Sequence, residues 1–200
     1  MKNKIIVIGT KNRDKLRELK RLLRGMKLRV KSLADFPECE DVEETGKTFV
    51  ANAKLKARFY SKHTKSLAFA DDSGLMVNAI NGRPGVYSAR FAGAGCTYLD
   101  NNRKLLKMLV KTPEAKRGAK FVCVIAIYDN GKLIGTVRGE CVGKIATEIR
   151  GANGFGYDPV FIPKGFNKTY AEISAKQKNT VSHRGRALRA AQKFLQSYLN

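Results

Sequence analysis

The order of strand-like and helix-like segments along the chain limits the fold more than any other feature of the sequence. The apolar, β-branched run 5–8 predicts a buried strand, and the leucines that follow recur at helical spacing as far as about Arg24. A second short strand is expected from residue 28, a helix over 48–62 and a third strand from Leu67. This alternation is typical of strands linked by helices that pack on the sheet.

The second half of the chain follows a different pattern, in which two strands are joined by a tight turn. Residues 121–128 and 133–142 are strand-like, and Asp129-Asn130-Gly131 between them is a hairpin turn. Further helices are expected over 98–110 and 182–199. Because early alternation is combined with an antiparallel hairpin, we predict an α/β fold whose sheet is mixed and flanked by helices.

The third expected strand carries the most informative residues. Its apolar run 67–70 ends in Asp71-Asp72-Ser73-Gly74, which predicts two adjacent carboxylates at the end of a buried strand. Side chains alternate along a strand, so at most one of the two faces a given site. A divalent cation held for a phosphorylated substrate would explain the pair, and Glu43 or Glu44 could be a further ligand. The structural alternative is an Asx-type turn.

Composition restricts the setting and the partners of the chain. The 39 Lys and Arg residues against 17 Asp and Glu residues give a formal charge of +22, which favours nucleic acid or nucleotide phosphates as a partner. No apolar run approaches the about 18 residues of a membrane span, and the first apolar run is too short for a signal peptide. We therefore expect a cytoplasmic protein. Four scattered cysteines without a Cys-x-x-Cys pair argue against a zinc site.

The turn between the first strand and the first helix has the composition of a phosphate-binding loop. Residues 9–15 supply backbone amides at a helix N-terminus, together with the side chains of Thr10, Asn12 and Lys15. A structural alternative is that Asn12 caps the helix and Lys15 is solvated.

Two later segments have the residue types of a base-binding site. The loop 153–159 combines glycines, which allow close approach of the backbone, with aromatic rings that can stack on a base. The basic segment 176–186 contains His183, which could donate to a purine carbonyl, and Arg184, which could hold phosphate. The alternative for this segment is a solvated, basic helix start.

Taken in order, these motifs resemble one known family. They are Thr10-x-Asn12-x-x-Lys15-x-x-Glu18, Glu44-Thr45-Gly46, Asp71-Asp72-Ser73-Gly74-Leu75, Gly85-Val86-Tyr87-Ser88-Ala89-Arg90-Phe91, Gly154-Phe155-Gly156-Tyr157-Asp158-Pro159 and Ser182-His183-Arg184-Gly185. From about residue 4 to residue 198 the chain is similar to the Ham1-like inosine triphosphate pyrophosphatase family, also called the dITP/XTP pyrophosphatases. The resemblance implies one domain over residues 1–200, with a mixed, elongated and twisted sheet, two lobes, a central active-site cleft and a homodimer.

The resemblance also implies roles for individual residues. Asp72 would activate the attacking water, and Glu44 and Asp72 would hold Mg²⁺. The substrate-binding residues that it implies are Thr10, Lys11, Asn12, Arg13, Asp14, Lys15, Ser73, Phe155, Gly156, Tyr157, Asp158, Lys178, His183 and Arg184. Within this set, the first six would bind the triphosphate and Phe155–Asp158 would frame the base. Lys178 would contact phosphate or base, and His183 and Arg184 would recognise the 6-oxo purine edge.

The implied reaction is Mg²⁺-dependent hydrolysis of ITP, dITP and XTP to the monophosphate and pyrophosphate, which cleanses the nucleotide pool of deaminated purines. No membrane partner and no specific nucleic acid are expected. One departure is Lys11, which stands where the family commonly has glycine. We therefore expect Lys11 to need a backbone conformation that glycine adopts more easily. Two rival hypotheses are a nucleic-acid-binding protein and a Maf-like pyrophosphatase of modified pyrimidines, and the retained 155–158 and 182–184 motifs disfavour both.

Overall fold

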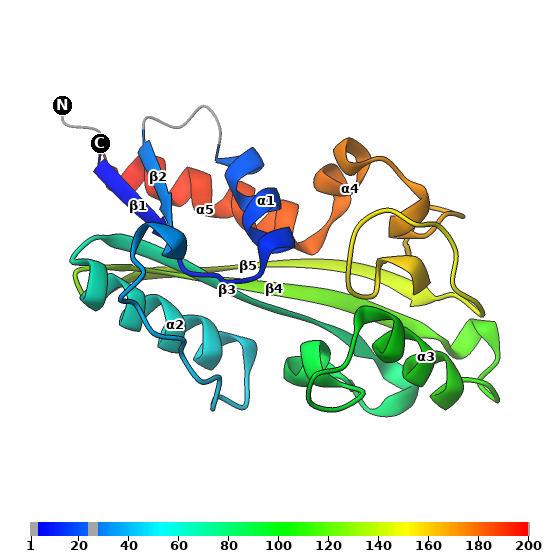
Figure 1. Ribbon diagram of the computed structural model, residues 1–200. Coiled ribbons are helices and arrows are strands. Elements are labelled where there is room, and N and C mark those ends of the chain that lie inside the picture. The colour runs from blue at the N-terminus through cyan, green and yellow to red at the C-terminus, as the bar shows by residue number, and fades with distance from the viewer. Residues whose placement is uncertain (1–3, 24–27, 200) are drawn as a thin grey trace. The chain divides into compact units, whose positions relative to one another are not determined.

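The computed structural model describes residues 4–23 and 28–199, and in this part of the chain six strands form one sheet in the order β2-β1-β3-β4-β5-β6 (Figure 1). The strands are β1 (Lys4–Ile8), β2 (Leu28–Ser32), β3 (Leu67–Val77), β4 (Gly118–Asp129), β5 (Lys132–Ile145) and β6 (Phe161–Pro163). Strand β1 pairs in parallel with both β2 and β3, whereas β6 runs antiparallel to β5. The predicted α/β fold with a mixed sheet is therefore confirmed.

Five α-helices accompany these strands in the described residues: α1 (Arg13–Leu22), α2 (Phe49–Thr64), α3 (Tyr98–Met108), α4 (Ala175–Val181) and α5 (His183–Leu199). Each of the helices expected from the sequence is present. Helix α3 ends at Met108, two residues before the expected end. Helix α1 ends at Leu22, and its expected end at Arg24 lies outside the described residues. The short helix α4 was not predicted. None of the described helices is both long enough and apolar enough to cross a membrane.

The chain divides into two compact units. Unit 1 comprises the described residues of Met1–Asp72, Cys123–Arg138 and Ala187–Asn200, and unit 2 comprises Ser73–Val122 and Gly139–Arg186. Strand β3 passes from one unit to the other between Asp72 and Ser73.

Unit 1 has helices on both faces of its strands, and the alternation of side chains decides which residue faces which helix (Figure 1). Ile6 and Ile8 of β1, with Leu67 and Phe69 of β3, pack against α1 and α5. The intervening residues Val7 and Ala68 point the other way and pack with Tyr60 of α2. The same alternation continues along β3 toward Asp71 and Asp72.

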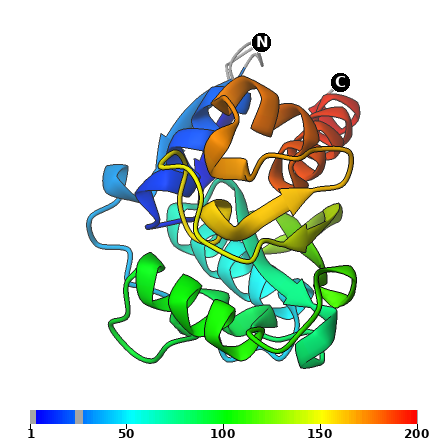
Figure 2. The same cartoon turned by 90° about the vertical axis from the view of Figure 1, so that its right-hand side faces the viewer.

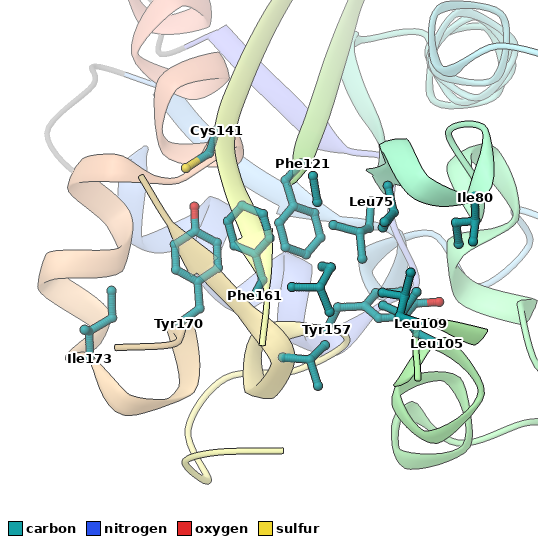
Figure 3. Close-up of a cluster of buried hydrophobic side chains, with 14 residues drawn as sticks. Leu75, Ile80, Leu105, Leu109, Phe121, Cys141, Tyr157, Phe161, Tyr170 and Ile173 are labelled. Carbon is teal, nitrogen blue, oxygen red and sulfur yellow. The ribbon is translucent and has the colours of Figure 1, made fainter. Parts of the chain in front are cut away.

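Unit 2 has its own hydrophobic core, built around an aromatic group (Figure 3). Phe121 of β4, Phe161 of β6 and Tyr170 lie together there, beside Leu75 of β3 and Leu105 of α3. Figure 2 shows the segment 151–163 of this unit between α3 (green) and α4 (orange). The loop that the sequence singled out for base binding is thus carried on a packed aromatic core.

The prediction that the paired aspartates lie at a strand end is wrong. Strand β3 continues through Asp71 and Asp72 as far as Val77, and both aspartates are buried. Buried carboxylates in the middle of a strand require polar partners. The helices on the two faces of β3 supply those partners.

Candidate active site

Asp71 faces the α1 side of the sheet and meets Lys15 there. Lys15 Nζ lies 3.1 Å from Asp71 Oδ2, and only 16% of the Lys15 side chain is exposed. The sulfur of Cys123, on the neighbouring strand β4, lies 3.9 Å from the same carboxylate oxygen. The alternative that Lys15 is simply solvated is therefore wrong, because its ammonium is held against a buried carboxylate.

The turn that leads into α1 is organised by its own side chains. Asn12 Oδ1 accepts hydrogen bonds from the backbone N–H groups of Asp14 and Lys15, both at 3.0 Å, so the alternative in which Asn12 caps the helix is confirmed. Thr10 Oγ1 accepts from the Asn12 N–H at 3.2 Å. These bonds fix the start of α1 and thereby aim Lys15 at Asp71.

The backbone conformation expected at Lys11 is not adopted. Among the described residues, the non-glycine residues with positive φ are Lys65, Asn81 and Asn130. The turn needs no left-handed residue, because it enters the helix through an extended Asn12 cap with φ −71° and ψ 112°. Arg13 and Lys11 are exposed, and the exposed pair between Lys11 Nζ and Asp41 Oδ2, at 3.7 Å, contributes little to stability.

Asp72 faces the opposite side of the sheet, toward α2, and there it meets two residues that the sequence analysis did not single out. Lys56 Nζ lies 2.5 Å from Glu44 Oε1 and 3.7 Å from Asp72 Oδ1, so one buried ammonium bridges the two carboxylates. Asn52 Nδ2 donates to Asp72 Oδ2 at 3.2 Å. A sequence signal for both was available: Asn52 and Lys56 are polar residues, four apart, on the buried stripe of a helix.

Asn52 also ties the acidic loop to this carboxylate. Its Oδ1 accepts from the backbone N–H of Gly46 at 2.8 Å. A side chain at position 46 would collide with that same oxygen, so the Glu44-Thr45-Gly46 motif needs glycine at its third position for close approach. Glu44 is held beside Asp72 by this contact and by Lys56.

Charged side chains from three segments meet around the middle of β3. Three carboxylates, those of Glu44, Asp71 and Asp72, interact with two ammonium groups, those of Lys15 and Lys56. Burial alone would lower the pKa of Lys56, but the neighbouring carboxylates outweigh burial and raise that pKa. Burial raises the pKa of Asp72, and the two lysines only partly oppose this effect.

Glu44 and Asp72 suit a cation that is shared with a bound ligand. Hard carboxylate oxygens are the donors that Mg²⁺ prefers, and Mg²⁺ commonly takes one or two of them while waters and substrate phosphates complete its shell. The pair already holds one cation, the Lys56 ammonium. Within the described residues, no group of three or more His, Cys, Asp or Glu side chains is arranged to hold a metal. The donor set therefore fits an ion completed by phosphate better than a closed protein cage.

In unit 2, the loop 153–159 is organised around Asp158. Its Oδ2 accepts from the Phe155 backbone N–H at 2.9 Å and from Lys178 Nζ at 2.6 Å. Gly154 has φ +80°, and a side chain there would collide with the Asp158 carboxylate. The loop therefore requires glycine at this position and an acid at position 158, and it is held closed by a buried ion pair.

The Phe155 ring makes two cation–π contacts and packs against a second aromatic ring. Lys178 Nζ lies 4.8 Å and the Arg184 guanidinium 5.5 Å from its centroid, and the ring of Tyr98 from α3 lies 6.0 Å away. Such contacts fix the position of an aromatic ring that could stack on a base.

His183 and Arg184, the first residues of α5, are both buried, so the alternative of a solvated helix start is wrong. Arg184 Nη2 donates to Ser73 Oγ at 2.9 Å. The imidazole of His183 stacks on the ring of Phe121. The two side chains diverge, as adjacent residues should, and each has a partner on a neighbouring strand.

The Gly85–Phe91 motif is explained by its contacts with the same loop. Tyr157 is buried in the core of unit 2, and its hydroxyl donates to the Ser88 carbonyl at 3.0 Å. Ser88 Oγ in turn accepts from the Leu75 N–H of β3 at 2.9 Å. Asn102 of α3, which was also missed, donates to the Gly156 carbonyl at 2.9 Å.

Comparison with known proteins decides the family. The sequence profile of the Ham1 family matches residues 6–194. The chain belongs to the Ham1 family. This Ham1 protein is 49% identical over 188 residues to a Bacillus cereus protein named dITP/XTP pyrophosphatase, which covers 93% of this chain and 92% of that one. A protein of the same name from Thermoanaerobacter pseudethanolicus is 45% identical over 190 residues, which cover 95% and 96% of the two chains.

Solved structures agree with this assignment. The structure of a HAM1 protein from Coxiella burnetii is 41% identical, with a TM-score of 0.87 over 96% of this chain and 98% of that one. The Ham1 protein of Staphylococcus aureus is 40% identical, also with a TM-score of 0.87, over 98% and 100%. The resemblance found in the sequence motifs is thus confirmed at the level of family and fold.

Proposed function

We propose that this Ham1 protein hydrolyses the noncanonical purine nucleoside triphosphates ITP, dITP and XTP to the monophosphate and pyrophosphate, with Mg²⁺. The observation that carries the proposal is the cluster in the middle of β3, where the carboxylates of Asp72 and Glu44 share one cation, the Lys56 ammonium. The name dITP/XTP pyrophosphatase, which relatives at 45–49% identity bear, supports the substrate class.

The triphosphate is bound by the turn 9–15 and by the lysines beside β3. The positive end of the α1 dipole favours an anion at this turn. Lys15 and Lys56 supply fixed positive charge, one on each face of the strand. Because both ammonium groups are already held by carboxylates, little side-chain entropy is lost when phosphate binds.

Asp72 accepts the proton of the attacking water, and Glu44 and Asp72 would together hold Mg²⁺. When bound, the ion polarises phosphoryl oxygens and lowers the pKa of coordinated water. The raised pKa of Asp72, caused by burial, suits a carboxylate that must take up a proton during the reaction. Asn52 keeps the Asp72 carboxylate oriented through its hydrogen bond.

Base selection rests with unit 2. His183 and Arg184 donate hydrogen bonds to the 6-oxo group of inosine or xanthine, and Phe155 provides the stacking face. Adenine presents an amine at this position, so it would leave a buried donor without an acceptor, which is costly. Within unit 2, Ser73 Oγ accepts a hydrogen bond from Arg184 and so helps to orient the guanidinium.

The cellular role that we propose is removal of deaminated purine nucleotides before polymerases use them, by a cytoplasmic homodimer. The proposal is tested by pyrophosphate release from ITP, XTP, dITP, ATP and GTP, with Mg²⁺ and with EDTA. We expect fast, metal-dependent release from the first three and little from ATP or GTP. Release from none of them, with the protein folded, would contradict the proposal, and salt-dependent binding of nucleic acid would then be measured.

A further inference from the structure

The side chain of His183 lies flat on the ring of Phe121. The two ring centroids are 4.5 Å apart and the planes are inclined by 8°, and the two residues are only 4% and 7% exposed. A histidine ring has a broad rotational preference about its last side-chain bond, so its own chemistry does not fix its plane. Packing against a flat neighbour does fix it.

Phe121 is itself held by the aromatic core of unit 2 (Figure 3). Phe161 meets it edge-on, with centroids 4.8 Å apart and an angle of 68°, and Tyr170 lies 6.0 Å away at 18°. Phe161 and Tyr170 also contact each other at 5.0 Å, and both are fully buried. Phe121 on strand β4 is therefore a rigid platform, since it could turn only by displacing two buried rings.

The direction of a hydrogen bond from imidazole depends on the plane of its ring. Both ring nitrogens carry their protons or lone pairs in that plane. A stacked neighbour covers one face of the imidazole ring. The ring edge, which carries the two nitrogens, stays available for hydrogen bonds. Holding the plane to within a few degrees therefore decides whether the N–H points at a carbonyl oxygen.

We propose that Phe121 is a positioning residue for base selection: it fixes the imidazole plane of His183 so that an edge N–H donates to the 6-oxo group of the purine. This inference rests on the proposed function, because it concerns the same base-recognition group. Phe121 acts through His183 and does not itself contact the substrate.

Proton NMR tests the stack without any turnover. The chain has two histidines, His63 and His183, so their ring resonances are few and a His183→Gln variant assigns them. Protons over the face of a benzene ring shift upfield. We expect upfield His183 resonances in the wild type, loss of that shift in Phe121→Leu and retention in Phe161→Leu. His63 lies 4.3 Å from Phe59 in unit 1, so Phe59→Leu is the matched control that changes only the His63 signals.

Kinetics test the consequence for the base. An aromatic pair is worth more than the area it buries, so Phe121→Leu should raise KM for ITP roughly two- to twelvefold. The inhibition constant of inorganic tripolyphosphate, which has phosphates and no base, should not change. Phe161→Leu removes a ring from the same core and controls for general destabilisation. Because Tyr170 still packs against Phe121, this variant should raise KM for ITP less than Phe121→Leu does and should leave the tripolyphosphate constant unchanged.

Two results would overturn the inference: identical His183 resonances in the wild type and in Phe121→Leu, or an equal rise of KM for ITP in Phe121→Leu and Phe161→Leu. If Phe121→Leu fails to fold, nuclear Overhauser contacts between the His183 and Phe121 rings in the wild type decide, and their absence refutes the stack. Lack of ITP hydrolysis by the wild type would refute the proposed function, while the resonances would still report on the stack.

Discussion

Replacing Lys56 by methionine removes the cation that bridges Glu44 and Asp72. At the 3.7 Å between Lys56 Nζ and Asp72 Oδ1, an effective dielectric constant near 20 gives a gross attraction of roughly 4–5 kcal/mol. Removing one partner of a buried pair costs about 3–5 kcal/mol. Because 27% of the Glu44 side chain is exposed and can turn to water, we expect a loss near the lower end, about 3 kcal/mol. For 200 residues this lowers Tm by roughly 6–12 °C.

The assay is thermal unfolding in EDTA and in Mg²⁺, for the wild type, Lys56→Met and Lys54→Met. Lys54 lies two positions away on the same helix and faces a different direction, so it controls for helix propensity and total charge. Mg²⁺ should raise Tm more in Lys56→Met than in the wild type, because the ion replaces the missing ammonium between the two carboxylates. Equal Tm values in EDTA, or an equal effect of Mg²⁺ on both proteins, would refute this reasoning.

The other predictions concern the same cluster and the loop of unit 2. Asp72→Asn should abolish turnover and keep a cooperative unfolding transition, because burial favours the neutral form of Asp72 and asparagine matches that form in shape; near-normal release of pyrophosphate would remove Asp72 from the role of base. Lys15→Ala should raise KM for ITP through lost phosphate contacts, measured by steady-state kinetics, and an unchanged KM would exclude the residue. In EDTA the pKa of the Asp72 carboxyl, followed by carbon NMR, should lie above the ordinary aspartate value of 3.8, because burial raises it; a pKa at or below 3.8 would contradict this. Gly154→Ala should weaken ITP binding and lower Tm, because the loop needs φ +80° there, and unchanged values of both would contradict the loop geometry.

The elements of the fold were predictable because their signals are local. The apolar run at 5–8 and the Asn130-Gly131 turn depend on neighbours in the sequence, and both predictions are confirmed. The continuation of β3 through Asp71 and Asp72 was not predictable in this way. Those carboxylates are buried in a strand only because Lys15 and Lys56, from helices distant in the sequence, pair with them.

The residues that the sequence analysis missed act through long-range contacts. Lys56 and Asn52 meet Asp72 across the packing of α2 on the sheet, and Phe121 meets His183 across more than sixty residues of chain. The expectation for Lys11 was wrong because of a local contact and not a long-range one. The cap by Asn12 lets the turn enter the helix without a left-handed residue. Motif order identified the family, whereas the partners that hold the motif residues in place required the structure.

The position of phosphate cleavage tests the central claim most directly. Phosphorus NMR of the products formed from ITP with Mg²⁺ resolves pyrophosphate from orthophosphate in a single spectrum. The proposed function predicts inosine monophosphate and pyrophosphate in equal amounts, with no diphosphate at any time. Inosine diphosphate with orthophosphate, or unchanged ITP in the presence of folded protein, would contradict it.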